Sequence, residues 1–200
     1  MNMKKIRMGM TGGGFGAFIG DAHRRASRIC NDFELVCGVF DVDYERSKEF
    51  AAKEGIDPAR CYENIDAMIE GELKLPADVR MQSVSIVVPN ALHFPFAKKF
   101  LQNGFHLVCE KPMTMTVEES EELERLVAST GLTFALTHTY TGYPMVRQMR
   151  DLVAKGVLGT IQRIDAQYYQ GWINSIIHGT DSRITGVWRL DPKHAGVSSC

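Results

Sequence analysis

The chain lacks the features that would place it in a membrane or on a nucleic acid. No stretch approaches the roughly 20 consecutive apolar residues that a membrane-spanning helix requires. The charge is nearly balanced, with 23 Lys and Arg, 24 Asp and Glu and a formal net charge of -1. Such a chain has no general attraction for nucleic acid or for an anionic membrane surface. We therefore expect a local site for a small molecule, with no nucleic-acid or membrane partner.

Paired cysteines are also missing. The five cysteines include no C-x-x-C pair, which argues against a structural zinc site and against a disulfide framework. Lys4, Lys5 and Arg7 resemble the basic start of a secretory leader, but the glycine-rich stretch after them is a poor apolar helix. We expect reduced thiols, no metal site and a cytoplasmic protein.

Glycine is concentrated near the N-terminus, between a β-rich start and a helical segment. A strand, a glycine turn and a helix in this order favour a pyrophosphate, because the backbone can approach it closely and the helix N–H groups attract its charge. The spacing Gly12-x-Gly14-x-x-Ala17 fits the dinucleotide fingerprint best. Gly20 is an alternative for the glycine that packs the helix against the strand. A flexible surface turn without a ligand is the non-functional alternative. Contacts to the cofactor are expected from Gly12, Gly14, Phe15, Gly16 and Ala17.

Asp41 ends the next β-rich segment and lies 29 residues after Gly12. A dinucleotide fold places near this point the acid that accepts hydrogen bonds from the adenosine ribose. Asp41 or Asp43 could instead cap the helix that starts near Tyr44. We assign the ribose to Asp41 and the cap to Asp43, which predicts NAD in preference to NADP because a carboxylate repels a 2′-phosphate.

Short β-rich segments alternate with helical ones along residues 1–138. The segments 33–40, 84–88, 105–109 and 132–137 are buried-strand patterns with short connections, which predicts an α/β fold with a Rossmann-type doubly wound parallel sheet. Ligands of such sheets bind beyond the carboxyl ends of the strands. The residues at those ends are Gly12 to Gly14, Asp41, Pro89, Asn90, Glu110, Lys111 and His138.

Local patterns also assign helix faces and ends. Asn90 is expected to cap a helix that runs to residue 101, and Thr116 with Glu119 forms a capping box for a helix that Gly131 ends. The first helix is expected to bury its apolar positions. These positions are Phe18, Ile19, Ala22, Ala26 and Ile29.

The pattern changes after His138. A helix whose apolar face begins at Met145 ends at Gly156, and 159–172 alternates apolar and polar residues over an unusual length for a parallel strand. We interpret 139–200 as the beginning of an incomplete second domain, α+β with a mainly antiparallel sheet. An unpaired strand edge beside an apolar patch recruits other chains, so we expect a homo-oligomer through this sheet.

Four motifs occur together in this chain: the glycine loop with His23, D-V-D-Y-E-R at 41–46, V-P-N-A-L-H at 88–93 and E-K-P at 110–112. In this combination they resemble the Gfo/Idh/MocA family of glucose-fructose oxidoreductase and inositol 2-dehydrogenase. The resemblance continues through H-T-Y at 138–140, Y-Y-Q-G-W at 168–172 and W-R-L-D-P at 188–192, and so covers nearly the whole chain.

The resemblance implies an NAD(P)-dependent dehydrogenase of sugars, cyclitols or related polyols. In this interpretation Lys111 is catalytic and holds the alcohol oxygen, Glu110 contacts the nicotinamide ribose region and Pro112 fixes the turn. The further cofactor contacts that we expect are Pro89, Asn90 and His93. Weaker candidates for substrate contact are His138, Tyr140 and Trp172.

Two departures from the family leave alternatives open. Thr139 and Thr141 stand where the family often has Asn and Arg. The Asp and His that follow the D-P-x-x-A-G segment in the family are not among the 200 residues, so we expect this C-terminally truncated chain to be inactive by itself. A non-catalytic dinucleotide-binding or sensor protein is the alternative function, and a methyltransferase is a second one that Lys111 and Pro112 argue against.

Overall fold

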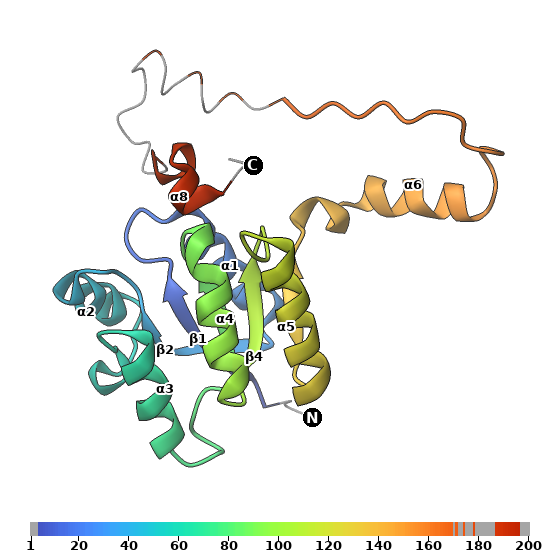
Figure 1. The fold of residues 1–200 in the computed structure, drawn as a ribbon. Coiled ribbons are helices and arrows are strands. Elements are labelled where there is room, and N and C mark those ends of the chain that lie inside the picture. Colours follow the sequence, from blue (N-terminus) through green and yellow to red (C-terminus); the bar gives the residue numbers. More distant parts are fainter. Residues whose placement is uncertain (1–3, 170, 172–173, 175–177, 179–186, 197–200) are drawn as a thin grey trace. The chain divides into compact units, whose positions relative to one another are not determined.

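The structure is a computed structural model that describes residues 4–169, 171, 174, 178 and 187–196. Two compact units are present, one formed by the described residues of Met1–Thr137 and Trp188–Cys200 and the other by those of His138–Val187. Figure 1 shows the element order. Within the described residues, no helix has the length and apolar character needed to cross a membrane.

The first unit is built on five parallel strands. They are β1 (Ile6–Gly12), β2 (Phe33–Val39), β3 (Ser83–Val87), β4 (His106–Glu110) and β5 (Phe134–Thr137), in the spatial order β2-β1-β3-β4-β5. The prediction of a doubly wound parallel sheet is confirmed. It succeeded because fully buried strands appear as short apolar runs, and every residue of β3 is buried.

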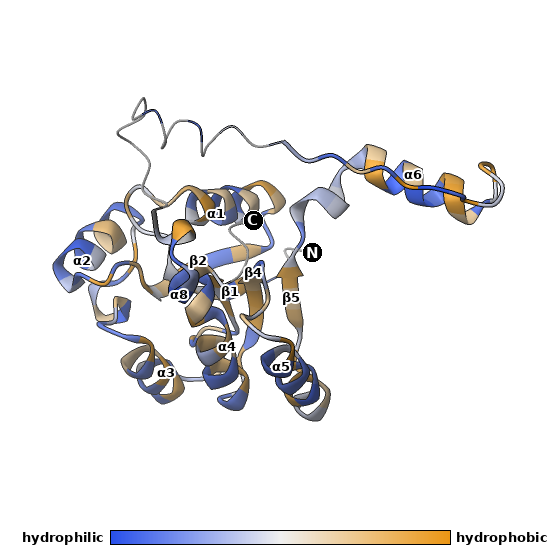
Figure 2. Cartoon of the chain, turned by 45° about the horizontal axis from the view of Figure 1, so that its top comes forward, coloured by the Kyte–Doolittle hydropathy of each residue, from blue (hydrophilic) through white to orange (hydrophobic). Residues whose placement is uncertain are grey.

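Helices cover both faces of this sheet. α1 (Phe18–Cys30) lies on one face, while α3 (Ile65–Lys74), α4 (His93–Gln102) and α5 (Val117–Thr130) lie on the other (Figure 2). α2 (Tyr44–Lys53) packs beside β2, and the short α8 (Pro192–Ala195) contacts the turn η2 (Asn90–Leu92). The turn η1 (Pro58–Arg60) links α2 and α3.

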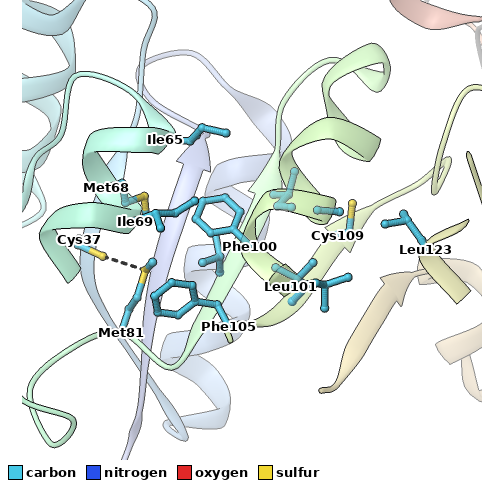
Figure 3. Packing of buried hydrophobic residues seen from close by; sticks show 14 residues of the cluster. Cys37, Ile65, Met68, Ile69, Met81, Phe100, Leu101, Phe105, Cys109 and Leu123 are labelled. Carbon is cyan, nitrogen blue, oxygen red and sulfur yellow. Dashed lines mark hydrogen bonds between the residues drawn. The ribbon is translucent and has the colours of Figure 1, made fainter. Parts of the chain in front are cut away.

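The main core lies between the sheet and the helices α3, α4 and α5. Figure 3 shows apolar side chains from α3 and α4 packed together over the strands, with Met81 and Cys37 at one end. Such packing excludes water from the sheet face and supplies most of the apolar burial. The fully buried members include Met68, Met81, Phe100, Leu101, Phe105 and Leu107.

Helix ends follow the local chemistry of the sequence. The Asp43 side chain accepts hydrogen bonds from the backbone N–H groups of Glu45 and Arg46, and the Thr116 and Glu119 capping box is present. These predictions are confirmed because caps depend on neighbours within three residues. Asn90 is a correction, because its side-chain amide donates to the Ala195 carbonyl and caps no helix.

The buried face of α1 was predicted correctly only at Ile19, which is partly buried and packs against the core cluster around Met10 and Phe40. Phe18 and Ile29 are 84% and 85% exposed, and the residues that face the sheet are Gly20, Arg24 and Ser27. The helix is turned this way because Gly20 makes a close contact with the glycine loop. Backbone proximity outweighs the burial of the two large apolar side chains.

The second unit contains the turn η3 (Thr139–Gly142) and α6 (Pro144–Ala154). Tyr140 stacks edge-on against Tyr143 and Tyr168, with ring centroids 5.6 and 5.5 Å away. The predicted strand over 159–172 is not seen, because the described residues 159–169 adopt no strand. Trp172 lies outside the described residues.

A buried carboxylate joins α3 to the chain on either side of it. Glu72 is 0% exposed and accepts from Arg60 Nε and Nη2 at 2.9 and 2.6 Å, from Tyr62 Oη at 3.0 Å and from Met81 N at 2.7 Å. Burial raises the pKa of Glu72, but its hydrogen bonds with Arg60, Met81 and Tyr62 outweigh burial and hold that pKa below its ordinary value. The ionised form is therefore the one that stabilises the fold.

Glu72→Gln should lower the free energy of unfolding by about 3 kcal/mol, because it leaves the Arg60 charge without its counter-ion. The matched control is Glu70→Gln on the same helix, whose ion pair with Lys74 is exposed and should contribute almost nothing. Urea unfolding at pH 7 measures both. Equal effects of the two variants would contradict this role for Glu72.

The buried pair of Arg60 and Glu72 should also make the free energy of unfolding depend on pH. Because the folded pKa of Glu72 lies below the unfolded value of about 4.3, its contribution is complete above the unfolded pKa and is lost as pH falls through the folded one. The acid-induced loss of stability should therefore be smaller in Glu72→Gln than in the unmutated chain.

Candidate active site

The strand order reverses direction at β1, which makes a topological switch point at one edge of the sheet. From β1 the chain moves outward to β2 and then crosses over to β3 on the other side of β1. Gly12 at the end of β1 pairs with Val87 at the end of β3, and Ile86 of β3 pairs with Cys109 of β4. The carboxyl ends of these three strands are therefore neighbours, and such a switch point is where α/β sheets bind ligands.

The glycine loop after β1 is shaped by two close approaches of the backbone. Gly12 has φ +75°, and a Cβ there would lie 2.5 Å from the Val87 carbonyl oxygen. A Cβ on Gly20 would lie 2.3 Å from the Cα of Gly13. Gly20 therefore fills the helix-packing place of the fingerprint, and Ala17, which we had preferred for it, is instead the N-cap of α1.

The N-terminus of α1 faces the loop without a side-chain cap. Ala17 makes no capping hydrogen bond, so the first backbone N–H groups of the helix keep their capacity to bind an anion. Arg24 on the same helix is 5% exposed, and its Nη1 donates to the Gly13 carbonyl. Phe15 packs edge-on against Phe50 at 5.1 Å. The loop is thus fixed from both ends.

Asp41 follows β2 and has a partly exposed carboxylate. Its Oδ1 accepts from the backbone N–H of Asp43 at 3.1 Å, and its Oδ2 lies 3.1 Å from Arg46 Nε. The carboxylate side chain is 21% exposed and that of Arg46 is 55% exposed. A hydroxyl donor can therefore still reach Asp41, while Arg46 offsets part of its charge.

Glu110 and Lys111 end β4 and point in different directions. Lys111 is exposed, whereas Glu110 is 7% exposed. The Glu110 carboxylate accepts from Thr137 Oγ1 at 2.6 Å and contacts His23 Nε2 at 2.9 Å, and its second oxygen accepts from the Lys111 backbone N–H at 3.3 Å. These contacts lie inside the domain and fix the Glu110 carboxylate at the end of β4; its contact with the nicotinamide ribose region stays a prediction.

Three predicted cofactor residues lie at the end of β3. His93 is 1% exposed, and its ring nitrogens lie 2.6 Å from the Pro112 carbonyl and 2.9 Å from the Val88 carbonyl. It therefore joins the two loops and has no nitrogen left for a cofactor. Asn90 is 6% exposed and donates to Ala195, while Pro89 is partly exposed on the same loop.

Two of the weaker substrate candidates belong to the second unit. His138 and Tyr140 are exposed there, and the Tyr140 and Tyr168 hydroxyls lie 2.5 Å apart. Their role as substrate contacts stays a prediction.

Sequence reasoning missed Arg24 and the partners of Glu110. An arginine on a helix normally indicates a solvated face, and Ser85 and Thr137 are ordinary strand residues, so no local pattern distinguishes them. His23 carried one available signal, because it follows Gly20 by three residues and therefore shares its face of the helix.

Comparison with known proteins adds to this geometry. Residues 6–138 match the model of an oxidoreductase family with an NAD-binding Rossmann fold, Gfo/Idh/MocA. The chain belongs to the Gfo/Idh/MocA family. This confirms the resemblance that the glycine loop and the E-K-P turn suggested.

Curated Gfo/Idh/MocA relatives extend beyond this chain. The oxidoreductase YfiI of Bacillus subtilis is 36% identical over 196 residues, which cover 98% of this chain and 49% of YfiI. The scyllo-inositol 2-dehydrogenase (NADP(+)) IolU of the same organism is 28% identical over 153 residues, covering 76% of this chain and 43% of IolU. The chain thus spans about half the length of the curated relatives it matches.

Solved structures of the family show the same fold. An inositol dehydrogenase homolog from Azotobacter vinelandii complexed with NAD+ has a TM-score of 0.89 at 36% identity, covering 96% of this chain and 49% of that one. The homolog complexed with NADH and myo-inositol has a TM-score of 0.85 at 35% identity, covering 94% and 48%.

Gly20→Ala should destabilise the first unit by about 1–3 kcal/mol, because the new methyl group would overlap the Gly13 backbone and move α1 or the loop. Gly16→Ala is the comparison, since Gly16 has φ +77° but nothing within 4 Å of its Cβ position. Gly16→Ala therefore tests only the cost of a positive φ at a residue with a side chain, which is about 1 kcal/mol. Thermal unfolding measures both, and a harmless Gly20→Ala would contradict the close packing.

Proposed function

We propose that this domain binds NAD and that, in a longer chain of the family, it transfers hydride between the nicotinamide and a sugar, cyclitol or related polyol. The observation that carries the proposal is the meeting of three strand ends at one edge, with the glycine loop after β1, the uncapped helix α1 after that loop and the exposed Lys111 directly after β4. Binding and chemical groups thus share one edge of the sheet.

The residues present fit a dinucleotide. The close contact between the Gly13 and Gly20 backbones brings the N-terminus of α1 up to the glycine loop. There the first turn of the helix supplies N–H donors and a positive dipole end for a pyrophosphate. Asp41 offers a carboxylate at the end of β2 for the ribose hydroxyls. When bound, the nicotinamide supplies the hydride acceptor or donor.

Lys111 is suited to the alcohol side of the reaction. Oxidation of a secondary alcohol removes hydride from carbon and a proton from the hydroxyl, so negative charge develops on oxygen. An ammonium donor within hydrogen-bond distance stabilises that charge, and an amine can take the proton. Lys111 is exposed beyond the end of β4, next to the switch point, and its backbone is held by Glu110.

The substrate class rests on the relatives. IolU is a scyllo-inositol dehydrogenase by name, and the Azotobacter vinelandii homolog was crystallised with myo-inositol. Both ligands are cyclitols with adjacent secondary hydroxyls. Because this chain spans about half of such proteins, we assign turnover to a chain that includes the remaining domain.

The cofactor preference follows from Asp41. NADH should bind several-fold more tightly than NADPH, because a 2′-phosphate would meet the carboxylate. Asp41→Ser should abolish the preference, since it removes the repulsion and frees Arg46 to pair with the phosphate. Arg46→Ala should sharpen the preference instead. Fluorescence titration measures both nucleotides, and equal affinities in the unmutated chain would contradict the assignment.

Lys111→Ala should separate chemistry from binding. In the 200-residue chain it should leave NADH affinity nearly unchanged, and in a chain extended by the second half of the family fold it should lower kcat by about 10² to 10⁴. Lys74→Ala, at the exposed end of α3, is the matched control. Normal turnover in the extended Lys111→Ala chain would exclude Lys111 from the reaction.

A further inference from the structure

Side chains from α1 and β5 meet at the Glu110 carboxylate at the end of β4, and β3 contacts the α1 side chain from its other side. His23 on α1 places its Nε2 2.9 Å from Glu110 Oε1 and its Nδ1 2.8 Å from Ser85 Oγ on β3. Thr137 at the end of β5 donates to the same Glu110 oxygen at 2.6 Å. The other Glu110 oxygen accepts from the Lys111 N–H at 3.3 Å. A connected network therefore runs from α1 to the backbone of Lys111.

The order Ser85, His23, Glu110 is that of a hydrolytic triad, but burial excludes that use. Ser85 is 0% exposed within the sheet, so no substrate carbonyl can reach its hydroxyl. The hydroxyl instead holds one nitrogen of the imidazole, which directs the Nε2–H toward the carboxylate. We therefore expect this network to hold its side chains in position and to carry out no chemistry of its own.

The network also fixes the charge of Glu110. Burial raises the pKa of this carboxyl, but its hydrogen bonds with His23 and Thr137 outweigh burial and hold the pKa below its ordinary value. An ionised carboxylate accepts through both oxygens, which lets one oxygen serve His23 and Thr137 while the other serves the Lys111 N–H. Protonation would remove an acceptor from this arrangement.

We propose that His23 is a positioning residue for Lys111, acting through Glu110. His23 follows Gly20 by three residues on α1, so the helix whose N-terminus faces the glycine loop also holds the end of β4. The glycine loop and the turn that carries Lys111 are thereby fixed to one helix. The inference rests on the proposed role of Lys111 in the reaction.

The test uses the 200-residue chain and two substitutions of His23. His23→Leu removes the donor to Glu110, whereas His23→Gln retains an N–H near the place of Nε2. His23→Leu should raise the pKa of Glu110, followed by carboxyl ¹³C NMR, and should speed hydrogen exchange of the Lys111 amide by about tenfold. His23→Gln should restore most of both properties.

Two controls separate position from general damage. His106→Leu deletes a histidine that accepts from the Thr133 N–H at the opposite end of β4, at 3.0 Å, and it should change neither readout. Thr137→Val removes the second donor to Glu110 without touching α1, so it should also raise the pKa of Glu110 even if His23→Leu does not fold. A folded His23→Leu chain with unchanged Glu110 pKa and Lys111 exchange overturns the inference.

NADH affinity is measured on the same samples. A chain that shows the expected NMR changes but binds no NADH contradicts the proposed function and leaves the network intact. A chain that binds NADH but shows no change at Glu110 or Lys111 on His23→Leu overturns the positioning role alone.

Discussion

The contact between Gly13 and Gly20 determines how the rest of the candidate site is assembled. A Cβ on Gly20 would lie 2.3 Å from the Gly13 Cα, so only glycine lets α1 lie this close to the end of β1. Three consequences follow from that approach. The N-terminus of α1 faces the glycine loop, and Arg24 reaches the Gly13 carbonyl. His23 reaches Glu110 at the end of β4.

This constraint explains where the sequence could and could not predict the fold. The strands and the caps at Asp43 and Thr116 depend on burial runs and on neighbours three residues away, and both were predicted. The buried face of α1 depends on the contact between Gly13 and Gly20. The spacing of apolar residues along the helix contains no information about that contact. The apolar pattern of Phe18 and Ile29 therefore indicated the wrong face, while Gly20, Arg24 and Ser27 line the right one.

In the candidate site, too, some residues could be predicted from the sequence and others could not. The glycine loop and Asp41 have the spacing of the dinucleotide fingerprint, and Lys111 follows a buried strand in the E-K-P turn, so the sequence could place all three after strands. The roles of Asn90 and His93 could not, because their partners are the carbonyls of Ala195, Pro112 and Val88. Glu110 was found by its place in the E-K-P turn, but its internal partners appear only when α1 and β5 converge on it and β3 holds His23 in place.

We infer that the glycine loop and the N-terminus of α1 hold NAD. Titration of the 200-residue chain with NADH, followed through backbone amide chemical shifts, tests this inference. Saturable shifts are expected at Gly13, Gly20 and Asp41, with smaller ones near Lys111. Saturable shifts confined to other parts of the chain, or none at all at millimolar NADH, would contradict it.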